Sequence, residues 1–288
     1  MLLNPLTFHA PQTLQEALKL YQGLENAKLK AGGTFLLNTL KLLKKKGAKT
    51  PAHVISLSKI PELKGIHVDE SKMMIKSMTT IDELFESSHL KDNFQVFRIV
   101  CRNISTQQIR NMATVGGNMT CRYTWTEMPA VMIGLEAKLH FLGADGQEEV
   151  LDAEDFYKNG AKTDKVFTQV SIDRDKKVSI AYRRVRKTMG VDIPLLSLLI
   201  KTTFIGERFT NTRVSVNNCV QFAQRDRMLE EFLNQSQCSP TIAEEALDHL
   251  DQPIYDTRSD DYKKHMFRVS MKNAIKELVD SRKSKSHI

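Results

Sequence analysis

Two double-glycine segments limit what this chain can fold into more than any other feature. Ala31-Gly32-Gly33-Thr34 follows an expected strand and precedes an expected helix, and Val115-Gly116-Gly117-Asn118 lies about 80 residues later. Without a Cβ atom, glycine can adopt positive φ and lets backbone approach a ligand closely. Free amides at a helix N-terminus suit a phosphate. The pair could serve the two phosphates of one dinucleotide, and ordinary tight turns are the alternative. Neither segment fits the Rossmann or P-loop pattern.

The composition is that of an ordinary globular protein. Of the 288 residues, 41% are hydrophobic and 26% charged, which argues against disorder. This length is typical of about two domains. The longest apolar stretches, such as Ile193–Ile200, are far shorter than the ~20 residues of a membrane-spanning helix. The N-terminus lacks the basic and apolar regions of a secretory signal, so we expect a cytoplasmic protein without a membrane span.

Positive charge is concentrated in a few segments. The formal net charge is +8, and basic residues cluster in residues 1–50, 183–187 and 263–288. Such clusters can meet nucleic acid, an acidic partner or a phosphate-bearing cofactor. The chain has one Trp and no nucleic-acid motif, so we expect no nucleic-acid binding. Arg183–Lys187 fits a solvated edge, and it equally fits a surface that faces an anionic cofactor or an acidic neighbouring chain.

The candidate metal ligands and nucleophiles form no recognisable constellation. Cys101, Cys121, Cys219 and Cys238 are widely spaced and include no C-x-x-C pair. The eight histidines form no H-x-x-x-H pattern, and no G-x-S-x-G motif occurs. We therefore predict no metal site and no catalytic side chain, and four reduced thiols in a cytosolic chain.

Helical and strand patterns follow one another without regular alternation, which predicts an α+β fold. Thr13 with Glu16, and Thr80 with Glu83, are typical of capped helix starts. Further helices are expected at Phe35–Leu43, Phe94–Cys101, Pro129–Leu135, Cys219–Leu233, Thr241–Leu250 and Asp260–Val279. Strands are expected at Leu29–Ala31, His53–Leu57, Ile66–Val68, Met73–Ser77, Lys138–Leu142, Val166–Ile172, Val178–Tyr182, Leu195–Phe204 and Thr212–Asn217. The main domain boundary is expected near residue 175.

Several other stretches are distinctive when they are taken together in chain order. They are Phe8–Ala17, Ala31–Thr34, Gln108–Asn118, Ala181–Arg184, Val191–Pro194, Tyr255–Arg258 and Tyr262–His265. Over nearly the whole chain they resemble the FAD-binding medium subunits of molybdenum hydroxylases. This is the family of the carbon monoxide dehydrogenase medium chain and the flavin domain of xanthine dehydrogenase. In particular, Gln108–Asn118 is similar to the family's Q-I-R-N-x-G-T-I-G-G-N.

The resemblance implies a domain organisation. Residues 1–175 would form a PCMH-type FAD-binding domain with subdomains at about 1–57 and 58–175. Residues 176–288 would form a C-terminal domain with an antiparallel sheet and helices. Cys121–Thr126 is bulky and aromatic where the family commonly has small residues, and this segment either shapes access to the flavin or simply packs.

The resemblance also implies a cofactor, FAD, bound without a covalent link. The family's pyrophosphate loops correspond to Lys30, Ala31, Gly32, Gly33, Thr34 and Phe35, and to Thr114, Val115, Gly116, Gly117 and Asn118. Glu127 stands two residues before Pro129, where many members have an Asp that contacts the polar chain of the flavin nucleotide. Tyr182 matches an aromatic residue near the flavin ring in some members.

The implied function is electron transfer within an oxidoreductase. The chain has no molybdopterin-binding sequence and no plant-type [2Fe–2S] motif. The resemblance therefore implies a heterotrimer, in which a large subunit carries the molybdenum cofactor and a small iron–sulfur subunit carries [2Fe–2S] clusters. FAD on this chain would collect the electrons and pass them to an external acceptor. The alternatives are a stand-alone FAD-dependent oxidoreductase and a redox-inactive FAD-binding module.

Overall fold

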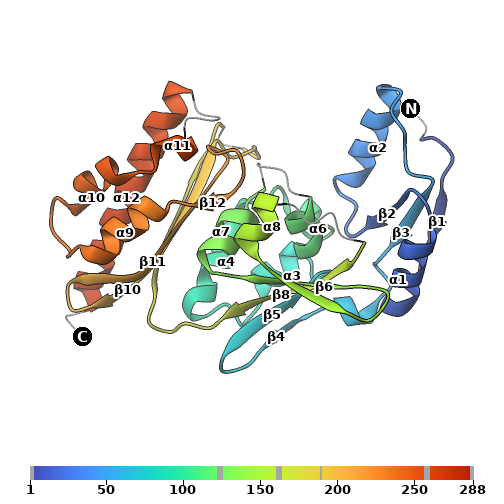
Figure 1. Cartoon of the computed structure of the whole chain (residues 1–288), viewed down its shortest axis with the longest axis horizontal. Helices are drawn as coiled ribbons and strands as arrows, with labels where there is room; N and C mark the ends of the chain where they lie inside the picture. Colours follow the sequence, from blue (N-terminus) through green and yellow to red (C-terminus); the bar gives the residue numbers. More distant parts are fainter. Residues whose placement is uncertain (1–2, 122–125, 160–163, 189, 256–259, 286–288) are drawn as a thin grey trace.

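A small parallel sheet forms the N-terminal part of the molecule (Figure 1). The computed structural model describes residues 3–121, 126–159, 164–188, 190–255 and 260–285. The sheet has the order β1 (Thr7–His9), β3 (His53–Ser56), β2 (Ala27–Lys30), and both pairs are parallel. Helices α1 (Leu14–Gly23) and α2 (Leu36–Lys45) lie in the two connections. A parallel pair needs such a crossover, and the order leaves β2 as an edge strand of this sheet.

A five-stranded antiparallel sheet follows. Its order is β4 (Ile66–Val68), β5 (Lys72–Lys76), β8 (Val166–Asp173), β6 (Lys138–Leu142), β7 (Glu148–Asp152). The expected strands at Ile66–Val68 and Met73–Ser77 are present as β4 and β5, and their antiparallel register makes them a hairpin. Helical segments of this part are η1 (Pro61–Leu63), α3 (Ile81–Glu86), η2 (Asp92–Gln95), α4 (Val96–Asn103), α5 (Gln107–Arg110), α6 (Val115–Thr120), α7 (Met128–Gly134) and α8 (Ala153–Asn159).

A four-stranded antiparallel sheet forms the C-terminal part. Its order is β12 (Gln224–Arg225), β11 (Arg208–Asn217), β10 (Leu196–Ile205), β9 (Ser179–Val185). On one side of it lie α9 (Arg227–Gln235), α10 (Ile242–Glu245), η3 (Ala246–His249), α11 (Gln252–Tyr255) and α12 (Asp261–Lys285) (Figure 1). Helix α7 packs on the other face of β10 and β11, which joins this sheet to the middle of the molecule.

The alternation of side chains along β10 explains this two-sided packing. Leu198 and Ile200 belong to the apolar cluster shared with the C-terminal helices, whereas Leu199 belongs to the cluster of the middle sheet. Successive side chains of a strand point to opposite faces, so one strand can serve both cores. At the crossing with α7, Ser215 Oγ donates to Ala130 O at 2.6 Å.

Most of the expected elements are present, and one expectation is wrong. Cys219–Leu233 was expected to be a single helix, yet the helix begins only at Arg227. Residues 224–225 instead pair with β11 as β12, and Asp226 then caps α9 by accepting from the Leu229 amide at 2.9 Å. The expected boundary near residue 175 falls between β8 and β9. The division into domains there stays a prediction.

Candidate functional site

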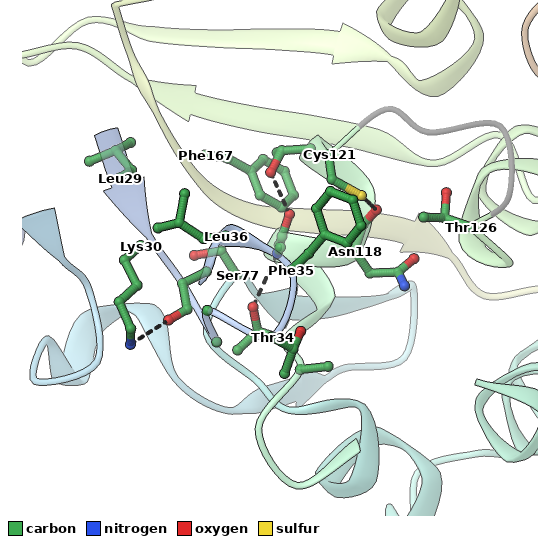
Figure 2. A pocket seen from close by; sticks show the side chains of 18 of the residues that line it. Leu29, Lys30, Thr34, Phe35, Leu36, Ser77, Asn118, Cys121, Thr126 and Phe167 are labelled. Atoms are coloured by element: carbon green, nitrogen blue, oxygen red, sulfur yellow. Dashed lines mark hydrogen bonds between the residues drawn. The ribbon is translucent and has the colours of Figure 1, made fainter. Parts of the chain in front are cut away.

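A cavity of about 1010 Å³ is lined by residues from the parts of the molecule that contain each of the three sheets. Its walls include the turn after β2, the segment from Ala113 to Cys121, and the loop from Val191 to Pro194 between β9 and β10. Its volume lies at the upper end of the range typical of small-molecule and cofactor sites. Figure 2 shows Lys30, Thr34, Phe35, Ser77 and Asn118 gathered around it from elements far apart in the sequence. It is therefore large enough for a nucleotide cofactor.

The first double-glycine segment presents open backbone to this cavity. Within the described residues, the amides of Ala31, Gly32, Gly33 and Thr34 donate to no protein acceptor. Gly33 has φ +77°, a conformation that glycine adopts without penalty. The Lys30 ammonium lies alongside, where it donates to Ala31 O at 3.4 Å. Consecutive free amides beside a cation are a suitable setting for an anionic group such as a phosphate.

The second double-glycine segment is organised differently. Gly116 and Gly117 lie in the first turn of α6, and neither has positive φ, contrary to the possibility raised by the sequence. Val115 donates to Thr79 O at 2.9 Å and Gly116 to Ser77 O at 2.8 Å. The Gly117 amide donates to Thr114 Oγ1 at 3.1 Å, which caps the helix. With these amides engaged, a contact between this backbone and a pyrophosphate stays a prediction.

The glycines allow the two segments to touch. A Cβ atom on Gly32 would lie 2.0 Å from the backbone oxygen of Met112, closer than any real contact of that kind. A Cβ atom on Gly117 would lie 3.4 Å from Cβ of Ala31. The sequence predicted that glycine leaves room for a ligand. In the structure, the space where a Cβ of Gly32 would lie is occupied by the backbone of Met112, shortly before the other segment. The two segments therefore pack directly against each other and form one continuous wall.

Two buried polar atoms on this wall lack a hydrogen-bond partner among the described residues. They are Ser77 Oγ and Asn118 Oδ1, and both residues line the cavity. Leaving such an atom unsatisfied costs about 1–3 kcal/mol, so a ligand with polar groups complements this wall. The sequence reasoning missed Ser77, although a polar residue at the carboxyl end of a predicted strand was a usable signal.

Glu127 stands in the cavity wall at the centre of a buried ionic cluster. It accepts from Tyr182 Oη at 2.6 Å and from Arg184 Nε at 2.5 Å. Arg184 Nη2 also donates to Asp192 Oδ1 at 2.8 Å. Burial raises the pKa of Glu127, while the hydrogen bonds from Tyr182 and Arg184 oppose the rise. The carboxylate stays available as an acceptor, because each oxygen has a second lone pair.

The side chain of Arg184 therefore lies in a position that the sequence did not indicate. The interpretation of Arg183–Lys187 as a solvated basic edge is wrong at Arg184, whose side chain is only 5% exposed and neutralises two carboxylates. Tyr182 is buried behind Glu127 and is not among the residues that line the cavity. Its predicted position near a flavin ring stays a prediction.

The structure brings most of the predicted site residues together. The cavity-lining residues among them are Lys30, Ala31, Gly32, Gly33, Thr34, Phe35, Thr114, Gly116, Gly117, Asn118 and Glu127. Val115 is buried beneath the wall. The site residues that the sequence reasoning missed include Ser77, Asp192 and Ile193. The segment Arg122–Trp125, whose role was left open, lies outside the described residues.

The described part of the chain offers neither a membrane-spanning helix nor a cluster of metal ligands. No helix there combines the length and the apolarity needed to cross a bilayer. No group of three or more His, Cys, Asp or Glu side chains in the described ranges is arranged to hold a metal ion.

The cavity has open backbone amides in the turn after β2, and elsewhere in its wall a carboxylate that can accept hydrogen bonds from hydroxyl groups. These features define the chain as a protein that binds a phosphate-bearing dinucleotide. More specifically, the chain belongs to the family described as "FAD binding domain in molybdopterin dehydrogenase", whose model matches residues 4–173. It is thus a flavoprotein whose cofactor is FAD, from a family of oxidoreductase subunits. The free amides, the Lys30 ammonium and the unpaired Ser77 and Asn118 atoms fit that cofactor.

Individual relatives match nearly the whole chain. The carbon monoxide dehydrogenase medium chain of Hydrogenophaga pseudoflava is 26% identical over 280 residues, which are 93% of this chain and 95% of the relative. The glyceraldehyde dehydrogenase medium chain of Sulfolobus acidocaldarius is 23% identical over 276 residues, with 93% and 96% covered.

Solved structures confirm the α+β fold. A carbon monoxide dehydrogenase structure from Hydrogenophaga pseudoflava superposes with a TM-score of 0.86 at 26% identity, covering 98% of this chain and 99% of that chain. Quinoline 2-oxidoreductase from Pseudomonas putida 86 superposes equally well, with a TM-score of 0.86 and the same coverage. Its identity is 19%, so it supports the fold alone.

Proposed function

We propose that this chain is the electron-transfer subunit of a molybdenum hydroxylase, which takes electrons from an iron–sulfur subunit and delivers them from FAD to an external acceptor. The observation that carries the proposal is the open turn of residues 31–34 on the wall of a cavity of about 1010 Å³. Medium chains or subunits among the relatives, including nicotine 6-hydroxylase of Paenarthrobacter nicotinovorans, support a place in a multisubunit enzyme.

The residues of the cavity divide the work of holding the cofactor. The amides of Ala31–Thr34 and the Lys30 ammonium bind the phosphates, because they are the donors without strong partners there. Asn118 and Ser77 bind polar groups next to the two glycine segments. Glu127 accepts hydrogen bonds from hydroxyl groups of the nucleotide chain. When bound, FAD supplies the redox chemistry, and the protein supplies binding and orientation.

The partners follow from what a flavin subunit needs. In the proposed cytoplasmic heterotrimer, a large subunit with the molybdenum cofactor oxidises the substrate. A small subunit with [2Fe–2S] clusters carries the electrons to this chain. The family model covers residues 4–173, but the proposed FAD site extends beyond that range. Asp192 and Ile193, in the loop between β9 and β10, also line the cavity.

Two measurements test the proposal. The purified chain, reconstituted with FAD and freed of excess, should release about one equivalent of FAD on acid precipitation, as a noncovalent cofactor does. Affinity purification from the native source should recover two further subunits, with molybdenum and iron in the eluate. A flavin-containing chain that is recovered alone and turns over a substrate would favour the stand-alone oxidoreductase. A flavin-containing chain with neither partners nor turnover would favour the redox-inactive module.

A further inference from the structure

Arg184 connects two walls of the cavity that are otherwise held by different elements. Its Nε donates to Glu127 at 2.5 Å, at the start of α7. Its Nη2 donates to both the side chain and the backbone oxygen of Asp192, each at 2.8 Å, in the loop between β9 and β10. Both carboxylates lie in residues that line the cavity, whereas Arg184 itself lies behind them.

The burial of this cluster makes the connection energetically important. The side chains of Arg184, Glu127 and Asp192 are 5%, 5% and 7% exposed. Removing one partner from a buried ion pair is costly, because the remaining charge is left without compensation. Arg184 is the only cation bonded to either carboxylate among the described residues, so two acidic groups depend on it.

The loop that Arg184 holds is itself ordered around Asp192. The carboxylate of Asp192 also accepts from the amides of Lys187 and Thr188, at 2.6 and 3.0 Å. The same loop carries Val191 and Ile193, which are 62% and 54% exposed and line the cavity edge. Arg184 therefore connects an apolar edge of the cavity to Glu127 on another wall.

We propose that Arg184 is a positioning residue of the FAD site, which locks Glu127 and the 191–194 loop into one arrangement and thereby closes this edge of the cavity over the cofactor. The proposal rests on the proposed flavin site. A planar guanidinium can bond two carboxylates at fixed angles, which a lysine ammonium on a flexible stem cannot reproduce. The role thus depends on the shape of the side chain as well as on its charge.

The test measures FAD affinity and flavin accessibility in matched variants of the full chain. Fluorescence titration of the apoprotein gives Kd, and iodide quenching at saturating FAD reports how open the site is. Arg184→Met should raise Kd by about 10- to 100-fold and increase quenching, since hydrogen bonds to charged groups are lost. Arg184→Lys should fold, recover part of the affinity and remain more open than the wild type.

Arg183→Met is the matched control. Arg183 is the neighbouring residue on β9, and it bonds Glu277 and Asn273 O of α12, away from the cavity. Its Kd should stay within about twofold of the wild type. Wild-type affinity and quenching in Arg184→Lys would overturn the proposal, and so would equal losses in the Arg183 and Arg184 variants. A wild-type chain that fails to bind FAD would instead overturn the proposed function. Should Arg184→Met not fold, Arg184→Lys alone decides.

Discussion

Gly32→Ala tests whether contact between the two glycine segments builds the FAD site. The new Cβ would stand 2.0 Å from the Met112 oxygen, 2.9 Å from its carbonyl carbon and 3.1 Å from Cα of Ala113. All three are backbone atoms, so no side chain can rotate away. Reaching even 3.0 Å from the oxygen requires the segments to separate by about 1 Å, the difference between 3.0 and 2.0 Å.

The cost follows from comparable overpacking, which is typically about 1–3 kcal/mol. The apoprotein can relieve the clash by letting the turn after β2 move away. The FAD complex needs both segments in place, so the cost appears in binding. It corresponds to an increase in Kd of about 5- to 150-fold.

The assay is fluorescence titration of each apoprotein with FAD, accompanied by thermal unfolding without the cofactor. Two glycines serve as internal standards. Gly117→Ala meets Thr114 Oγ1 at 3.1 Å and should be milder, and Gly23→Ala meets nothing within 4 Å and should be neutral. The reasoning is refuted if Gly32→Ala binds FAD as tightly as Gly23→Ala does.

Three further outcomes follow from single groups. Ser77→Ala should leave the apoprotein at least as stable as the wild type, since Ser77 Oγ has no partner among the described residues, but it should weaken FAD binding about 2- to 10-fold; equal affinity would show that FAD does not use it. Burial raises the pKa of Glu127 above its unfolded value of about 4.3, so its contribution to stability is full below that pH and is lost as pH rises through the folded pKa. Thermal unfolding of the apoprotein between pH 4 and 7 should therefore decline less steeply in Glu127→Gln; parallel curves would contradict this. Asp226→Ala removes the acceptor of the Leu229 amide and Tyr255 Oη, and should lower the free energy of unfolding by about 2 kcal/mol or more without changing Kd for FAD; a denaturant titration measures the first quantity.

Local signals predicted most of the elements. Thr13 and Thr80 cap α1 and α3 as expected, and Thr80 with Glu83 forms a full capping box, because such caps involve only a few consecutive residues. The strand β6 has the bounds that were expected for it, Lys138–Leu142. The start of α9 was mispredicted because Gln224 and Arg225 pair with β11, and this pairing depends on the sheet and not on the local pattern.

The site was predictable only where a motif carries it. The two glycine segments could be found because their residue types are unusual. Arg184 lay in a basic run that resembled a surface, and nothing local indicates that Glu127, 57 residues earlier, would neutralise it. The position of Ser77 at the end of a predicted strand was a usable signal, but only the folded structure shows that its hydroxyl is buried without a partner among the described residues.

The contact between the two double-glycine segments, which forms one wall of the cavity, also connects FAD binding to the stability of the chain. Among the three apolar clusters of the described residues, the N-terminal one around Ala17, Leu18 and Ile55 is the smallest. A ligand at 100 times its Kd adds about 2.7 kcal/mol to the folded state. In the proposed complex, FAD contacts all three parts and therefore stabilises the N-terminal part against local opening. Without FAD, the N-terminal part should open first and become accessible to proteases.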